Sequence, residues 1–218
     1  MEIQSVVSNL KARKYAGSNI TDATLYHSLP FPGYEHIACH RQGTLERWQL
    51  IANNLDYKDK TMVDLGCSNG GISLLFAKNG AKQITGYDYD NDSLEVGRLV
   101  AKQLNIANVE FVHKTINLKF FSYLPYIDIT VWMSHYMWIV KQYGILEAQN
   151  MLSMLSHKSN VLVFETATEK DGMAGNHMKG LTQDHIGNYL LKNTVYTNIK
   201  DIGFVKGWHN RHIFVCSK

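Results

Sequence analysis

A glycine-rich turn, Gly66 to Gly71, lies between a short apolar run and an amphipathic run, and its residues suit close contact with a ligand. Gly66 and Gly70 have no Cβ, so the chain can bend sharply and its backbone can approach a ligand closely. The following apolar run, 83–88, ends in Asp88. A carboxylate at the carboxyl end of a neighbouring strand can accept hydrogen bonds from both hydroxyls of a ribose. The pattern therefore predicts a site for a nucleoside-containing cofactor.

The elements that must position these residues alternate, from Asp56 onward, between β-branched or aromatic runs and helical patterns, which is typical of βαβ units and a parallel sheet. The last two predicted strands are separated only by the region of Asn210, which is too short for a crossover helix, so they must pair antiparallel. Strands are predicted at 61–65, 83–88, 108–113, 127–133, 160–166, 203–208 and 211–217. Helices are predicted at 71–79, 91–104 (capped by Asn91 or Asp92), 117–123, 139–156 and 181–192 (capped by Thr182).

The composition indicates one α/β domain in a reducing compartment. The chain has 218 residues, of which 45% are apolar and 19% are charged. No apolar run reaches the roughly 18 residues that a membrane span requires. The N-terminus lacks a basic, apolar leader, so we expect a cytoplasmic protein. The three cysteines show neither metal-type nor disulfide-type spacing. The net charge of +3 is spread along the chain, so a nucleic-acid partner is not required.

Residues 1–54 precede the predicted sheet and form an appendage with Pro30, Pro32 and a turn at Gly33, followed by a helix near 45–54. The segment is richer in aromatic and imidazole groups than a linker needs. We interpret it as a helical lid over the cofactor cleft; the alternative is a helix packed on the sheet with a surface loop.

The motifs resemble a known family. Residues 63–70 (VDLGCSNG) with 86–88 (GYD) resemble the first two motifs of class I S-adenosylmethionine-dependent methyltransferases. Residues 109–113, 128–134 and 161–165 resemble that family's third, fourth and fifth strands, and the terminal hairpin resembles its antiparallel last strand. The resemblance covers roughly residues 45 to 218. It implies a seven-stranded Rossmann-like α/β sheet with helices on both faces and a cofactor-binding methyltransferase domain at 55–218.

Two narrower resemblances concern the acceptor side. The spacing of residues 128–144, 164–167 and 210–214 is similar to the methyltransferase domain of bacterial enzymes that cap O-antigen polysaccharides. Tyr26 and His27, with His40 and Arg41, are similar to a segment of methyltransferases of the wobble-uridine carboxymethyl-transfer type. By that resemblance Arg41 would meet the methionine carboxylate, while Tyr26 and His27 would lie near the substrate.

The resemblance implies S-adenosylmethionine as cofactor, with S-adenosylhomocysteine as product and no metal. Asp64 would bond the turn or, through water, the methionine amino group, and Asp88 the ribose. Ser68 replaces the usual second glycine, and Lys114 with Thr115 replaces the acidic residue that often binds adenine, so we expect adenine to be held near Ile116. The predicted cofactor-binding residues are Asp64, Gly66, Cys67, Ser68, Gly70, Asp88, Tyr89, Thr115, Ile116, Ser134 and Arg41.

The carboxyl ends of the fourth and fifth strands carry the candidates for catalysis. His135 is a candidate general base because imidazole titrates near neutrality, with a structural hydrogen bond as the alternative. Glu165 is a second candidate for base work or substrate contact. Tyr136 and Trp138 are predicted to line the substrate pocket, although aromatic residues at a helix start are as often core. Arg211 would suit a phosphate or carboxylate.

These observations predict methyl transfer from S-adenosylmethionine to a small-molecule or carbohydrate-linked acceptor. Oxygen is the expected acceptor atom, because the sequence motifs for methylating base amines or pyrimidine carbon are absent. An RNA methyltransferase of tRNA type is the second hypothesis. A nicotinamide-dependent oxidoreductase is a third, but the spacing of Gly66, Gly70 and Gly71 fits its fingerprint poorly. A non-catalytic cofactor-binding protein is a fourth.

Overall fold

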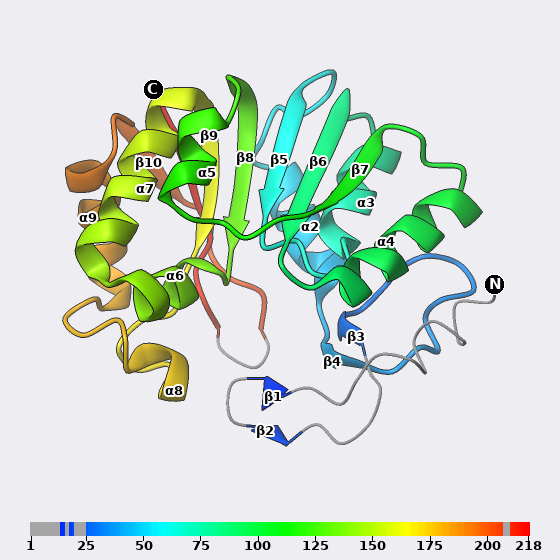
Figure 1. The fold of residues 1–218 in the computed structure, drawn as a ribbon, viewed down its shortest axis with the longest axis horizontal. Helices are drawn as coiled ribbons and strands as arrows, with labels where there is room; N and C mark the ends of the chain where they lie inside the picture. Colours follow the sequence, from blue (N-terminus) through cyan, green and yellow to red (C-terminus); the bar gives the residue numbers. More distant parts are fainter. Residues whose placement is uncertain (1–13, 16–17, 20–24, 207–209) are drawn as a thin grey trace.

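A seven-stranded sheet with helices on both faces forms the centre of the computed structural model, which describes residues 14–15, 18–19, 25–206 and 210–218 (Figure 1). The spatial order of the strands is β10-β11-β9-β8-β5-β6-β7. This arrangement confirms the predicted α/β fold with an antiparallel terminal pair. The parallel strands are β5 (Thr61–Leu65), β6 (Gln83–Asp88), β7 (Val109–His113), β8 (Ile127–Met133) and β9 (Ser159–Glu165), and the antiparallel ones are β10 (Asn198–Asp201) and β11 (Phe214–Ser217).

The strand order reverses at β5, because the chain proceeds from β5 through β6 to β7 on one side and then returns to place β8 on the other. In open α/β sheets, ligands bind beyond the carboxyl ends of the strands at such a switch point. Parallel register brings the ends of β5, β6, β8 and β9 to the same edge of the sheet.

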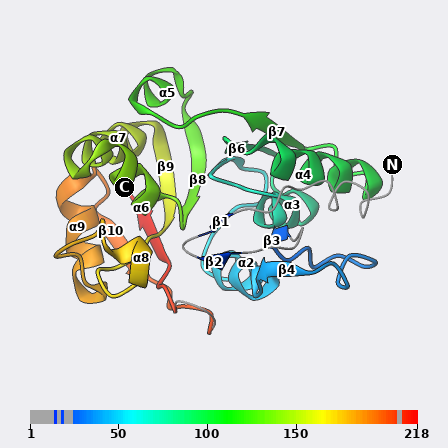
Figure 2. The same cartoon turned by 60° about the horizontal axis from the view of Figure 1, so that its bottom comes forward.

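Helices cover the two faces of the sheet (Figures 1 and 2). Each face has its own apolar core. Side chains alternate along β5, so that Met62 packs on one core while Val63 and Leu65 pack on the other. One face carries α2 (Thr44–Ala52), α3 (Gly71–Lys78) and α4 (Asn91–Gln103). The other face carries α5 (Leu118–Tyr123), α6 (Tyr136–Tyr143), α7 (Ile145–Lys158) and α9 (Ile186–Asn193). The short helix α8 (Gly172–Gly175) and the 3-10 helix η1 (Gln183–His185) lie in the connection between β9 and α9.

The described short strands of the N-terminal segment lie at the carboxyl edge of the sheet. Strands β3 (Leu25–His27) and β4 (Cys39–Arg41) form a parallel pair beyond the arrow tips of the central strands, and β1 (Lys14–Tyr15) pairs with β2 (Ser18–Asn19) (Figure 1). The predicted helix at 45–54 is α2, but the segment before it contains short strands. Whether residues 1–54 act as a lid stays a prediction, and residues 1–13, 16–17 and 20–24 lie outside the described residues.

Several predicted element boundaries are wrong. The strand expected at 203–208 is instead β10 at Asn198–Asp201, because Gly203 has a φ of 91° that interrupts extended backbone; residues 207–209 lie outside the described residues. The helix expected at 139–156 is two helices, since Gly144 has a φ of 85°. The one expected at 181–192 begins as η1 and continues as α9. The residue preceding α4 is Asp90, which accepts a hydrogen bond from Ser93 Oγ.

Candidate active site

The turn between β5 and α3 requires glycine at two positions. Gly66 and Gly70 have φ angles of 76° and 73°, which disfavour other residues. A Cβ at Gly66 would lie 2.7 Å from Cγ of His135, and one at Gly70 would lie 2.2 Å from Cζ of Phe111. The turn is held against β6 because the amides of Gly66 and Cys67 both donate to the Tyr87 carbonyl, at 2.8 and 3.1 Å. The backbone of the turn is therefore fixed in a compact bend.

Asp88 points toward this turn. The residue is 7% exposed, and its carboxylate accepts hydrogen bonds from the Ser68 amide at 2.8 Å and from the Asp90 amide at 2.9 Å. Ser68 has a φ of 52°, an uncommon value for serine that orients its amide toward the acid. A pocket of about 330 Å³ opens beside Asp88, and its lining consists of Gly66, Asp88, Tyr89, Lys114, Thr115, Ile116, His135, Ile139 and Gln142. A pocket of this size is suited to a small organic ligand.

His135 lies in that pocket and accepts a hydrogen bond through its ring. Its Nδ1 accepts the indole N–H of Trp132 at 3.1 Å, so the neutral ring carries its proton on Nε2. Burial lowers the pKa of His135 to about 4. With one nitrogen engaged as acceptor and the other protonated, the ring has no free lone pair for a substrate proton. This geometry argues against the predicted role of general base.

Asp64 is a buried acid beneath the turn. It is 6% exposed and accepts a hydrogen bond from Ser73 Oγ at 2.6 Å. Burial raises the pKa of Asp64 to about 7, against the opposing effect of that hydrogen bond. A bound cation would favour its ionised form. Cys67 is also buried, and burial raises the pKa of its thiol well above the usual value, so it packs as an apolar group.

Glu165, at the end of β9, is the centre of an ionic cluster. It is 1% exposed; one carboxylate oxygen accepts from Ser134 Oγ and from Arg41 Nη2 at 3.1 Å, and the other accepts from Arg47 Nη2. Burial alone would raise the pKa of Glu165, but Arg47 and Arg41 outweigh it and hold the pKa at about 2. A carboxylate so firmly ionised and paired is a poor proton acceptor, which argues against base work by Glu165.

Ser134, which follows β8 directly, connects a further arginine, Arg211, to this cluster. It has a φ of 56°, a conformation that costs energy and is typical of functional sites. Its Oγ accepts from Arg41 Nη1 at 2.6 Å and from Arg211 Nη1 at 3.4 Å. Arg211 also donates from Nε to Asp171 at 3.1 Å. Three guanidinium groups thus converge on two carboxylates.

Glu165 and the three arginines line a second, larger cleft of about 770 Å³. Among the described residues, its charged side chains are four cations, Arg41, Arg47, Lys206 and Arg211, and two acids, Glu46 and Glu165, so positive charge is in excess there. The remaining lining residues are His40, Gln42, Gly43, Val205 and Asn210. The cleft therefore suits an anionic ligand.

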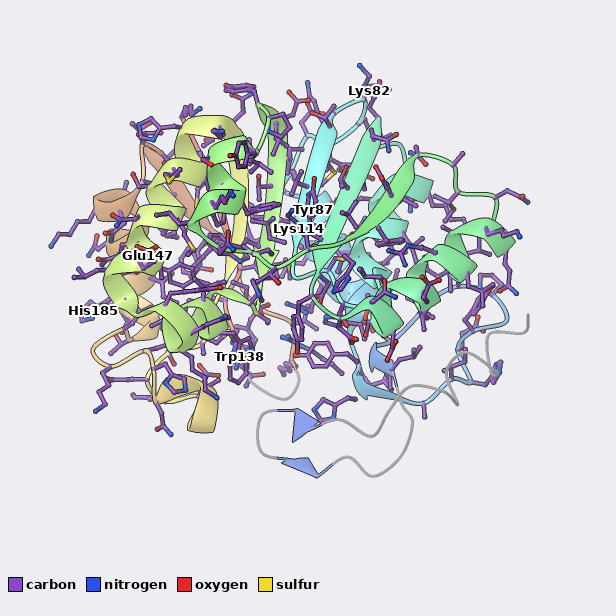
Figure 3. The ribbon with its side chains drawn as sticks, viewed as in Figure 1. Lys82, Tyr87, Lys114, Trp138, Glu147 and His185 are labelled. Atoms are coloured by element: carbon purple, nitrogen blue, oxygen red, sulfur yellow. The ribbon has the colours of Figure 1, made fainter. Side chains whose placement is uncertain are left out.

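The predicted aromatic substrate residues lie in different surroundings. Tyr136 is a correction: it is 0% exposed and shares a hydrogen bond with Tyr189 Oη at 2.6 Å, so its ring belongs to the core. Trp138 lies toward the carboxyl edge, opposite Lys82 at the other edge of the sheet (Figure 3), and neither cleft described above includes it. Tyr26 packs edge-on against His27 at a ring distance of 4.6 Å.

His27 lies where burial and the charges of Arg41 and Arg47 lower its pKa well below the usual value. The sequence prediction missed Arg47 and Asn69. A signal for Arg47 existed, because Thr44, Arg47 and Ile51 share the buried face of α2 at helical spacing. No local pattern indicated the contacts of Asn69.

Among the described residues, no group of three His, Cys, Asp or Glu side chains is arranged to hold a metal ion. Nor does any helix in the described part of the chain have the length and apolarity to cross a membrane.

Comparison with known proteins gives the family. Residues 56–180 match the model of a methyltransferase domain. The ribosomal protein L11 methyltransferase of Colwellia psychrerythraea is 39% identical over 56 residues, covering 26% of this chain and 19% of that protein. The ubiquinone biosynthesis O-methyltransferase of Neisseria meningitidis is 34% identical over 65 residues, covering 30% and 27%.

Solved structures share the fold. The bifunctional kinase-methyltransferase WbdD matches with a TM-score of 0.79 at 22% identity, over 99% of this chain and 46% of that one. The magnesium protoporphyrin IX methyltransferase of Synechocystis PCC 6803, with bound S-adenosylmethionine, matches with a TM-score of 0.57 at 15% identity, over 80% and 78%. This chain spans about half of WbdD and, in the two matches above, 19% and 27% of the curated relatives. Because the domain model matches more than half of the chain, the chain belongs to the methyltransferase-domain family, whose cofactor is S-adenosylmethionine.

Proposed function

We propose that this protein transfers the methyl group of S-adenosylmethionine to an ionised oxygen, a carboxylate or phosphate, of a small-molecule or carbohydrate-linked acceptor. The observation that carries the proposal is the convergence of Arg41, Arg47 and Arg211 on a cleft at the carboxyl edge of the sheet. Both predicted bases are poor proton acceptors in this arrangement, because His135 Nδ1 is bonded to Trp132 and Glu165 is paired with arginines.

The residues of the turn fit the cofactor. The bend at Gly66 and Gly70 presents backbone rather than side chains, which permits close approach of a nucleoside. Asp88, whose carboxylate faces the turn, would hold the ribose hydroxyls, and buried Asp64 would hold the ammonium of the methionine part. When bound, the sulfonium supplies a methyl group that is already electrophilic.

The state of the two predicted bases supports an ionised acceptor. An alcohol is protonated at pH 7 and needs a base when it attacks, whereas a carboxylate or a phosphate, with pKa values of about 4 and 6, is already ionised. His135 lacks a free lone pair, and Glu165 is bound to Arg41 and Arg47. An acceptor that arrives ionised makes a base unnecessary, and the protein has only to orient it.

The arginines supply that orientation. Glu165 offsets the charges of Arg41 and Arg47 only in part, since one carboxylate faces two guanidinium groups, and Arg211 is paired with Asp171. Lys206 adds a further positive charge to the cleft. A guanidinium group binds carboxylate or phosphate oxygens in a fixed fork, which would fix the direction of the attacking oxygen.

The direct test is product analysis. The protein is incubated with methyl-labelled S-adenosylmethionine and, separately, with acidic metabolites, phosphorylated glycans and total RNA, and the labelled products are analysed by mass spectrometry. We expect a methyl ester of an acid or phosphate among the small acceptors. A label confined to RNA, or on a neutral hydroxyl, would refute the proposal.

A variant pair tests the arginine cleft once an acceptor is known. Arg211→Met should raise the KM for the acceptor about tenfold or more, because a charged hydrogen bond is lost. The affinity for S-adenosylhomocysteine should stay within about twofold, since Arg211 is not part of the pocket beside Asp88. The control is Lys82→Met, which removes a positive charge at the opposite edge of the sheet (Figure 3). Equal effects of the two substitutions would exclude a specific contact.

A further inference from the structure

The glycine turn is joined to the N-terminal segment by one buried side chain, Asn69. Its amide nitrogen donates to the His27 carbonyl at 2.9 Å, and its amide oxygen accepts from the His27 amide at 3.1 Å. The side chain is 0% exposed. Asn69 therefore satisfies both backbone groups of His27, as a neighbouring strand would.

The conformation of the turn decides where this amide points. Asn69 lies between Ser68 and Gly70, whose φ angles of 52° and 73° are both positive. Ser68 is in turn bound through its amide to Asp88, the predicted ribose ligand. A ligand that holds the turn and Asp88 in one conformation therefore also fixes the direction of the Asn69 side chain.

From His27 the connection continues to the acceptor cleft. His27 in β3 is aligned with Arg41 in β4, and the Ser28 amide donates to the Arg41 carbonyl at 3.1 Å. Arg41 extends its guanidinium group to Ser134 at 2.6 Å and to Glu165 at 3.1 Å. The position of β3 thus fixes the backbone from which Arg41 reaches the cleft.

We propose that Asn69 is a positioning residue that couples the glycine turn to the acceptor cleft. A cofactor held by the turn fixes the position of β3 and β4 through Asn69, and this brings Arg41 into the cleft. The inference rests on the proposed function, because it requires the turn to bind the cofactor. Such coupling is reciprocal, so an anion bound by Arg41 favours the same arrangement of the turn. The acceptor site is then complete only when the methyl donor is in place.

The test is amide hydrogen exchange with and without S-adenosylhomocysteine, followed in two segments, the turn 66–71 and the segment 25–41. In the wild-type protein we expect the ligand to slow exchange about fivefold or more in both segments. In Asn69→Asp the ligand should still slow the turn but should leave 25–41 unchanged, because a carboxylate oxygen replaces the donor that faces the His27 carbonyl.

Asn79→Asp is the matched control, since Asn79 also donates from its side chain to a backbone carbonyl, that of Leu75 at 2.7 Å, but at the other end of α3. In Asn79→Asp the ligand should slow exchange in both segments, as it does in the wild-type protein. A merely structural role for Asn69 would speed exchange of 25–41 equally with and without ligand and leave the ligand response intact, which overturns the coupling. A wild-type protein that responds only in the turn overturns the coupling alone. One that responds in neither segment overturns the proposed function as well.

Discussion

Replacing Glu165 by glutamine is the sharpest test of the ionic cluster. Glutamine keeps the size of the side chain and its ability to accept a hydrogen bond, but it removes the negative charge between Arg41 and Arg47. Glu165 and Arg47 are both buried, with side-chain exposures of 1% and 6%. Removing one partner of a buried ion pair leaves the other charge uncompensated, which is strongly destabilising.

The pKa of Glu165 gives the magnitude. It lies at about 2, against an ordinary value of 4.5. One pH unit corresponds to about 1.4 kcal/mol, so the ionised carboxylate contributes about 3 kcal/mol to folding. For a chain of this length, 1 kcal/mol shifts Tm by roughly 2–4 °C. We therefore expect Glu165→Gln to lower Tm by roughly 6–12 °C at pH 7.

The pH dependence has a defined sign. Because the folded pKa of Glu165 is depressed, its contribution is complete above pH 4.5 and is lost as the pH falls toward 2. The difference in Tm between wild type and Glu165→Gln should accordingly be constant from pH 7 to about 5 and shrink below that. Thermal unfolding followed by circular dichroism at a series of pH values measures it.

The matched control is Glu95→Gln, which removes the acid of an exposed pair with Arg98 on α4. An exposed pair contributes roughly 0–1 kcal/mol, so the change in Tm should be small. If Glu165→Gln unfolds within about 2 °C of the wild type at pH 7, or if its deficit persists undiminished at pH 3, the cluster does not hold the charge as argued.

Three further predictions concern the cofactor pocket. Asp88→Ala should weaken binding of S-adenosylhomocysteine about tenfold or more, because two charged hydrogen bonds are lost; unchanged affinity in calorimetry would refute the ribose assignment. Burial raises the pKa of Asp64 to about 7, and a nearby ammonium group should lower it, so ligand binding at pH 7 should release about half a proton. Calorimetry in buffers of different ionisation enthalpy measures this release, which should vanish in Asp64→Asn; an enthalpy independent of buffer would contradict it. Turnover of His135→Gln should stay within about tenfold of the wild type, whereas a 100-fold loss with normal cofactor affinity would restore His135 as the base.

The cofactor half of the site was predictable because its signals are local. The turn and Asp88 lie within residues 61–88, where strand, glycine turn and strand-end acid follow one another in the sequence. Strand pairing of β5 with β6 then brings the acid and the turn together without help from distant parts of the chain. The contact between the Ser68 amide and Asp88 follows from that pairing.

The acceptor half was less predictable because its members are far apart in the sequence. Arg47 and Glu165 are separated by 118 positions, and Ser134 and Arg211 by 77. No local pattern indicates that α2, which carries Arg47, and the connection before β11, which carries Arg211, meet at the end of β9. Tyr136 illustrates the same difficulty at short range, since it follows a strand end directly, yet the first turn of α6 directs its ring into the core.

The surplus of positive charge in the cleft connects the fold to the proposed chemistry. Glu165 alone cannot balance Arg41 and Arg47, and holding like charges close together in a partly buried space is unfavourable. An anionic acceptor relieves that repulsion when it binds, so the same interaction that orients the oxygen also supplies affinity. A neutral acceptor would leave the repulsion in place and would still lack a base. In the proposed coupling this charge is complete only when the turn is held in place, because Arg41 reaches the cleft from β4, the neighbour of the strand that Asn69 attaches to the glycine turn.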